Sequence, residues 1–166
     1  MKPSFLILGI AAILVAAAAG SSALSATPAS APAAKSHQVV LYGHVKSVAH
    51  QGHRFVMRFD PAWWLTGVAA ERACGCSPVP NDYFIVDESH RLLTFVVRRD
   101  AHVTVLTRHG SGTIPTTSIS VAELAKIVAG KNPNHRQLTE PKAGFWIRIG
   151  AKYPNPVVSL DQQYQP

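Results

Sequence analysis

Apolar and polar residues alternate in several short stretches of the chain, as they do in half-buried β-strands. The clearest stretch has an apolar face and a mostly basic face, made by Phe55, Met57 and Phe59 and by Arg54, Val56 and Arg58. Comparable patterns predict further strands at residues 39–48, 83–87, 91–97, 102–107, 145–149 and 157–160.

Short turn signals separate most of these strands. Residues 49–52 end in Gly52 and are expected to join the first two strands into a hairpin. Residues 87–90 and Asp100-Ala101 predict that the next three strands form an antiparallel meander. Residues 108–117 have the composition of a loop, and Pro154-Asn155 predicts the last turn. Gly43 is expected to mark a bulge or a close backbone approach.

Asp60-Pro61 has the form of a helix start, with aspartate as N-cap and proline at the first helical position. A helix beginning here would carry Trp63 and Trp64 in its first turn, with at least one of them facing the sheet. Thr66-Gly67 would break or kink it before it continues over residues 68–73.

A second helix is predicted over residues 121–129. Ser120 and Glu123 form a capping box in front of it, and Gly130 is a stop signal. Its apolar face consists of Val121, Leu124, Ile127 and Val128.

About seven short strands and two short helices, without βαβ alternation, predict an α+β fold that is mainly antiparallel β. The expected architecture is a small barrel-like or strongly curved sheet with helices covering its ends. An OB-like barrel is one candidate.

The first 31 residues have the features of a secretory signal peptide. Lys2 is followed by an uncharged apolar run at residues 5–19 and by Ala29-Ser30-Ala31, although Ala26 is an alternative cleavage position. The apolar run is shorter than the roughly 20 residues that span a bilayer, and an uncleaved anchor is the alternative. Residues 32–36 are expected to be a flexible lead-in, followed by a single β-rich domain at 37–166. The expected location is extracellular or associated with the cell envelope.

The formal net charge of the 166-residue chain is +7, and its basic residues are scattered. An exported protein rarely meets nucleic acid, so the partners expected from this charge are an anionic envelope polymer or another secreted protein.

Two cysteines stand in the spacing Cys74-Gly75-Cys76. Export favours a disulfide between them. A redox motif or a soft-metal pair for Cu(I) are alternatives, as is a pair of free thiols.

Three segments carry a resemblance to a known group of proteins. They are residues 59–67, residues 81–85 and residues 160–166, which read FDPAWWLTG, NDYFI and LDQQYQP. Together they resemble a family of small secreted actinobacterial proteins of unknown function. The resemblance implies a shared fold and export, and it implies no activity.

No catalytic signature emerges from the titratable residues. The eight histidines lack the spacing of a zinc site, and no G-x-S-x-G motif is present. Asp60, Asp82 and Asp161 are the best candidates for a polar cluster, and a hydrolase would need such acids, His90 or a cysteine to converge in a cleft. We predict no catalytic residue, no metal and no cofactor.

Two groups of residues are candidates for binding. Asp60, Trp63, Trp64, Asp82 and Tyr83 form a candidate polar and aromatic corner. Trp146 and Arg148 lie on the face opposite Phe145 and Ile147, and with the basic face of Arg54 and Arg58 they would make a surface for an anionic or carbohydrate partner.

The sequence thus favours a secreted, non-catalytic domain that binds an envelope or extracellular ligand or partner. A secreted hydrolase and a redox or metal-handling protein that uses Cys74 and Cys76 are the alternatives.

Overall fold

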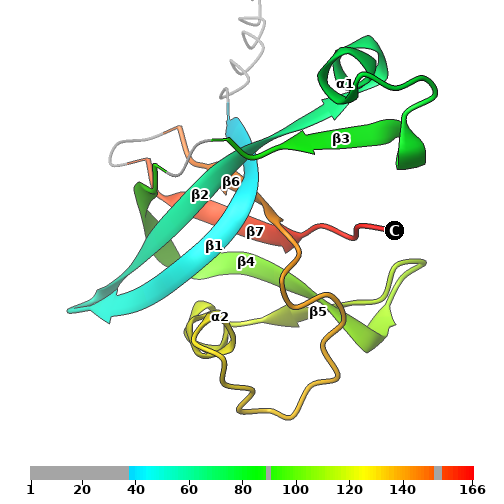
Figure 1. Cartoon of the computed structure of the whole chain (residues 1–166). Coiled ribbons are helices and arrows are strands. Elements are labelled where there is room, and N and C mark those ends of the chain that lie inside the picture. Colours follow the sequence, from blue (N-terminus) through cyan, green and yellow to red (C-terminus); the bar gives the residue numbers. More distant parts are fainter. Residues whose placement is uncertain (1–37, 89–90, 152–154) are drawn as a thin grey trace, which may run out of the picture. The chain divides into compact units, whose positions relative to one another are not determined.

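The structure is a computed structural model that describes residues 38–88, 91–151 and 155–166 (Figure 1). Its strands are β1 Val39–Gln51, β2 Arg54–Thr66, β3 Tyr83–Val86, β4 Leu93–Ser111, β5 Thr116–Ile119, β6 Phe145–Ile149 and β7 Val157–Gln162. Its helices are α1 Gly67–Cys74 and α2 Val121–Val128, and a short 3₁₀ turn, η1 Pro80–Asp82, precedes β3. The predicted signal peptide and lead-in, His37, His90 and Pro154 lie outside the described residues.

Five of the strands close into a barrel. The sheet order is β3-β2-β1-β6-β7-β4-β5, and an additional pairing of β2 with β4 closes the ring of β2, β1, β6, β7 and β4. Every pairing is antiparallel except that of β4 with β7. A closed five-stranded ring with a helix between its third and fourth strands is an OB-like barrel. The predicted fold class is therefore confirmed.

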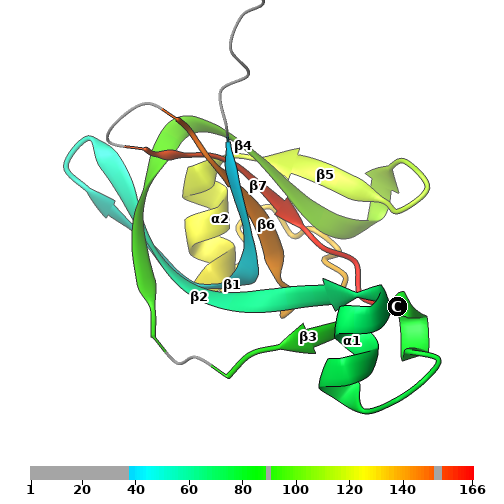
Figure 2. The same ribbon diagram turned by 90° about the horizontal axis from the view of Figure 1, so that it is seen from above.

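The inward-facing residues of the barrel and the apolar face of α2 form one core. Met57, Phe59, Ile147 and Leu160 are fully buried there. Val121 and Leu124 of α2 are buried in the same cluster, and Ile127 and Val128 pack against it, as their helical spacing predicts. Figures 1 and 2 show α2 against the barrel, and they show α1 beside β3, after the C-terminal end of β2.

The predicted helix start at Asp60-Pro61 is wrong. β2 continues as a strand through both residues to Thr66, and α1 begins only at Gly67. The strand is possible because β2 pairs with β4 up to Phe59 and with β3 from Trp63 onward. Pro61 lies between these two ladders, where its missing N–H costs no hydrogen bond on that edge.

Gly43 of β1 lies tightly against the backbone of β2. A Cβ atom at Gly43 would lie 2.1 Å from the carbonyl oxygen of Asp60 and 2.9 Å from the ring of Phe59. The predicted close backbone approach is therefore present, and it lies opposite Pro61 in the β1–β2 ladder. The bulge of this ladder falls farther along, between Val45 and Ser47.

The predicted meander is also wrong. β3 pairs with β2 rather than with β4, and the strands predicted at 91–97 and 102–107 are a single strand. Asp100 and Ala101 lie inside this strand, at an irregularity of its pairing with β7 between Val97 and His102. Ala101 is buried, so the chain bends there without leaving the sheet.

The loop predicted at residues 108–117 is too long, because β4 continues to Ser111 and β5 begins at Thr116. The sequence of β5 is Thr-Thr-Ser-Ile, and only Ile119 is buried, so it offers no alternation to recognise. It is an added edge strand held by antiparallel pairing with β4.

Only one of the two hydrogen bonds of the predicted capping box in front of α2 is formed. The Ser120 hydroxyl accepts a hydrogen bond from the Glu123 N–H at 3.1 Å. The Glu123 carboxylate binds the guanidinium of Arg136 through two nitrogens. This pair ties the long segment between α2 and β6 to the helix, and the Arg136 hydrogen bond lowers the pKa of Glu123.

Replacing Gly43 by alanine tests the strand crossing. We expect Gly43→Ala to lower the free energy of unfolding by about 3 kcal/mol or more, because the added methyl collides with backbone rather than with a movable side chain. Gly150→Ala is the matched control, since the nearest atoms to its Cβ would be the Val158 side chain at 3.3 Å and the Pro156 carbonyl oxygen at 3.4 Å. Equal urea midpoints for the two variants would contradict the role of Gly43.

The pair of Glu123 and Arg136 predicts a pH dependence. The folded-state pKa of Glu123 is lowered, so its stabilisation is present above the ordinary glutamate pKa of about 4.3 and is lost as pH falls through the lowered value. The stability difference between wild type and Glu123→Gln should therefore shrink below about pH 4. Urea unfolding from pH 7 to pH 3 measures it, and a constant difference would contradict the prediction.

Candidate aromatic cleft

Four aromatic residues from four strands form one cluster, which we call the aromatic cluster. Trp64 of β2 stacks on Tyr83 of β3, with ring centroids 4.1 Å apart and planes at 17°. Tyr42 of β1 contacts Trp64 and Trp146 of β6, both at 5.0 Å. The two tryptophans lie 5.9 Å apart. Such pairs stabilise by about 0.5–1.5 kcal/mol each beyond the area they bury.

The strand registers place these rings together. Tyr42 lies opposite Ala62 on one side and opposite Trp146 on the other. Gly144, the residue before β6, leaves room for the Tyr42 ring, because a Cβ there would lie 2.4 Å from the Tyr42 hydroxyl oxygen. Tyr83 reaches Trp64 as a diagonal neighbour across the β2–β3 ladder.

The C-terminal segment closes over the cluster. The Trp146 indole N–H donates to the Gln163 side chain at 2.9 Å, and the Gln165 amide donates to the Tyr42 hydroxyl at 2.6 Å. Asn81 donates to the carbonyl of Pro166 at 3.2 Å. Figures 1 and 2 both place the C-terminus near β3. The three segments that carry the family resemblance therefore meet around one aromatic cluster.

Tyr42 is almost fully buried by these contacts. Burial raises the pKa of its hydroxyl, while the hydrogen bond from Gln165 acts in the opposite direction. The hydroxyl is consequently neutral at physiological pH and available as a hydrogen-bond partner for the tail.

A cleft opens beside the aromatic cluster because β1 and β2 diverge. Their ladder begins at the pair of Tyr42 and Ala62, and the residues beyond this pair separate. The space between them has a volume of about 520 Å³, within the range of ligand sites. It is lined by Val40, Leu41, Tyr42, Pro61, Ala62, Trp63, Trp64, Val86, Glu88 and Trp146. We call it the aromatic cleft.

The two neighbouring tryptophans have different roles. Trp64 is part of the aromatic cluster, as a strand residue and not as a helix residue packed on the sheet. Trp63 points the other way by strand alternation and is 72% exposed at the cleft. Trp63 and Val40, which is 46% exposed, therefore both present apolar surface to solvent at the cleft.

The predicted polar corner is only partly assembled. Trp64 and Tyr83 meet, but Asp60 is buried against the ammonium of Lys46, with Nζ and Oδ2 2.9 Å apart. Its second oxygen, Oδ1, has no hydrogen-bond partner among the described residues. Asp82 is exposed, with a positive φ, in the turn before β3.

Asp161, the third acid of the predicted cluster, has partners of its own. It accepts hydrogen bonds from Thr104 at 2.9 Å and from Arg148 at 2.7 Å. Within the described ranges no hydrogen bond or ion pair links any two of Asp60, Asp82 and Asp161. His90, the histidine of the hydrolase hypothesis, lies outside them.

The predicted basic and aromatic surface is divided. Trp146 joins the aromatic cluster, and Arg148 is engaged by Asp161. Arg58 lies opposite Ser47, roughly 15 Å along β1 from Tyr42 at about 3.3 Å per residue. Arg54 is farther still, beside the hairpin turn. The two arginines of β2 therefore form a separate surface from Trp146.

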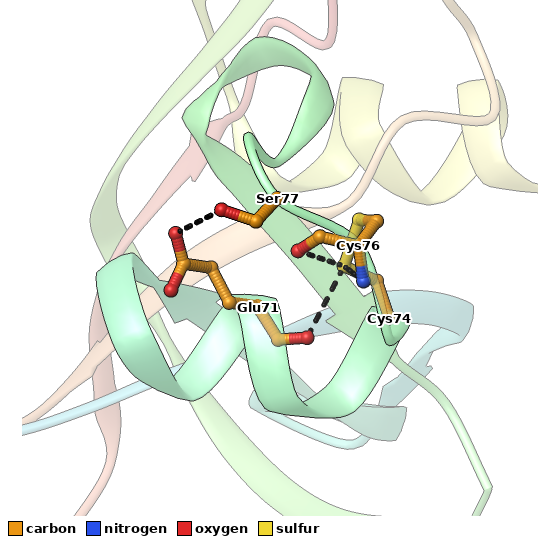
Figure 3. The surroundings of a disulfide bond; sticks show 4 residues. All are labelled: Glu71, Cys74, Cys76 and Ser77. Carbon is orange, nitrogen blue, oxygen red and sulfur yellow. Dashed lines mark hydrogen bonds between the residues drawn. A yellow bond between two sulfur atoms is a disulfide. The ribbon is translucent and has the colours of Figure 1, made fainter.

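Cys74 and Cys76 form a disulfide at the C-terminal end of α1 (Figure 3). Gly75 between them adopts a positive φ of 64°, and the Cys76 N–H lies 3.1 Å from the Cys74 sulfur. The Ser77 hydroxyl binds the Glu71 carboxylate at 3.1 Å. These contacts clamp the end of the helix to the following loop, and neither sulfur lines the aromatic cleft.

The histidines at described positions are dispersed. His44 lies 4.0 Å from Asp87, and His50 contacts the ring of Phe55. In the described part of the chain no three His, Cys, Asp or Glu side chains are grouped as they would be around a metal ion. No helix there is long and apolar enough to cross a membrane.

Sequence reasoning missed Val40 and Tyr42 as site residues. Val39-Val40-Leu41 is an unbroken apolar run at the start of a strand, which indicates that both faces of the strand meet apolar groups. Tyr42 carries no such signal, because only the pairing of β1 with both β2 and β6 brings it into contact with Trp64 and Trp146.

Fold and site together define a small OB-like barrel with an aromatic cleft at one strand divergence. No protein-family model matches the chain, and comparison with curated proteins and with solved structures finds no match. The resemblance to secreted actinobacterial proteins stays a prediction.

Truncation of Trp64 and truncation of Trp63 should change the free energy of unfolding by very different amounts. Trp64→Ala removes the centre of the aromatic cluster and should lower the free energy of unfolding by about 3 kcal/mol. Trp63→Ala should change it by less than about 0.5 kcal/mol, because the side chain is mostly in solvent. Chemical denaturation of both variants measures this, and a large loss for Trp63→Ala would show that Trp63 is a structural residue.

Proposed function

We propose that this protein is an exported, non-catalytic binding domain that holds an envelope or extracellular ligand in the aromatic cleft. The observation that carries the proposal is the exposure of apolar side chains at that cleft. Trp63 is 72% exposed and Val40 46% exposed, and both line the same space of about 520 Å³. Soluble proteins rarely leave such side chains together in water unless they contact a partner.

The chemistry of the lining supports binding rather than catalysis. Glu88 is the only charged residue among the described residues that line the cleft. A nucleophile with a base, or two converging carboxylates, would be the minimum for hydrolysis. Aromatic and aliphatic walls instead favour stacking and apolar contact, which select a ligand without transforming it.

Export is supported by the signal-peptide pattern of residues 1–31 and by the pairing of Cys74 with Cys76. Disulfides persist in oxidising compartments, so the bond is consistent with a protein that works outside the cytoplasm.

A second candidate site is the basic surface of β2. Arg54 and Arg58 are exposed there, and Arg58 is held by a 2.7 Å hydrogen bond to Thr94 of β4. OB-like barrels commonly bind ligands on the face of their second and third strands, which here are β2 and β4. This surface suits an anionic envelope polymer.

Binding to fractionated cell envelope tests both sites. We expect the protein to bind envelope material and Trp63→Ala to lose at least tenfold in affinity, about 1.4 kcal/mol. Val68→Ala is the matched control, because Val68 is an exposed apolar residue outside the cleft.

The two sites give different outcomes. Loss of binding in the double variant Arg54→Ala, Arg58→Ala, with strong salt dependence and no effect of Trp63→Ala, would replace the cleft by the basic surface. Wild-type binding by all of these variants would contradict both.

A further inference from the structure

Two strand edges face each other across the aromatic cleft without pairing. Among the described residues, Val39, Val40 and Leu41 pair with β6 alone, because the ladder to β2 begins at Tyr42. Residues 63–66 of β2 pair with β3 alone. Each strand therefore has a partner on its outer side and none on the side that faces the cleft. Figure 2 shows β1 and β2 running in diverging directions from their crossing.

An unpaired strand edge presents a row of N–H and C=O groups that another extended chain can pair with. Proteins commonly protect such edges with charged residues, proline or a covering loop. Here the edge residues of β1 are apolar and exposed, Val39 by 54% and Val40 by 46%. The exposed edge of β1 has none of these protections among its described residues.

We propose that the aromatic cleft binds an extended peptide segment of a partner protein, which adds as a strand along the free edge of β1. This inference rests on the proposed function and specifies its ligand. A peptide backbone repeats its donors and acceptors at the spacing of the strand edge, which a carbohydrate does not. The peptide's side chains would alternate between the aromatic cluster and Trp63.

The charge of the cleft specifies the peptide further. Glu88, exposed just after β3, is the only charged residue among the described residues that line it. In a protein with a net charge of +7, this is a locally acidic margin. The bound segment should therefore be apolar with a lysine or arginine where it passes β3.

The size of the cleft sets the expected affinity. The free edge covers Val39 to Leu41, about 10 Å at roughly 3.3 Å per residue. Three or four peptide residues bury far less than the roughly 1,600 Å² of a standard interface, so we expect a weak and transient interaction.

A random linear decapeptide library displayed on phage tests the proposal. Selection uses the full chain, with Trp63→Ala for counter-selection. We expect enriched peptides to alternate apolar residues and to carry a basic residue. As synthetic peptides they should bind Trp63→Ala at least tenfold more weakly than wild type, while Val68→Ala should bind within twofold of wild type.

N-methylation of one enriched peptide, one amide at a time, tests strand addition itself. A strand directs successive amides to opposite sides. Methylation at alternate positions should weaken binding at least tenfold, and methylation at the positions between should leave it within twofold. Glu88→Gln should lower the affinity for the peptide that carries the basic residue and leave its norleucine-substituted form unchanged.

The outcomes separate this inference from the proposed function. Peptide binding that is insensitive to every N-methylation overturns strand addition but leaves a ligand-binding cleft. Strand addition is also overturned, and a ligand-binding cleft remains, if no peptide is enriched while envelope oligosaccharide binds in a way that requires Trp63. If no peptide is enriched and envelope binding is unaffected by Trp63→Ala, both are overturned. Circular dichroism of Trp63→Ala confirms that the variant is folded in each case.

Discussion

The fold depends on the close crossing of β1 and β2 at Gly43 and Pro61. The backbones approach so closely there that a single methyl group at Gly43 would overlap the Asp60 carbonyl. Proline on the other strand tolerates the position because it lies between the ladders to β4 and β3. One side of the crossing belongs to the closed barrel, and on the other side the two strands separate. The barrel and the cleft are thus produced by the same constraint.

The separated ends are held apart by the aromatic cluster and by the C-terminal tail. Tyr42 of β1 lies between β2 and β6. In the tail, Gln165 binds the Tyr42 hydroxyl and Gln163 binds the Trp146 indole. Without these hydrogen bonds the Tyr42 hydroxyl and the Trp146 N–H would be left without a partner inside the protein. Each such unsatisfied group would cost about 1–3 kcal/mol. The tail therefore supports the wall of the cleft, and the cleft is largely pre-formed.

Much of the architecture followed from local pattern. β6 was predicted with its observed bounds, and the first hairpin and α2 were predicted as elements. Their apolar periodicity is strong and their ends carry Gly or capping residues. The errors occurred where the same pair of residues is compatible with two kinds of local structure. Asp60-Pro61 is a good helix start, yet it lies inside a strand, and Asp100-Ala101 has the form of a turn, yet it lies at a bend in β4.

The sequence by itself determined the class of fold, the second helix with its apolar face and the strand at residues 145–149. These properties depend on residues close together in the chain. Only the tertiary structure decided which of the two neighbouring tryptophans joins the aromatic cluster, that Arg54 and Arg58 are remote from Trp146, and that three distant segments meet at Tyr42. Those outcomes depend on strand order and register across the closed barrel. Side-chain alternation assigns each residue to one of the two faces of its strand. What each face contacts is decided only by the pairing of strands that are far apart in the sequence.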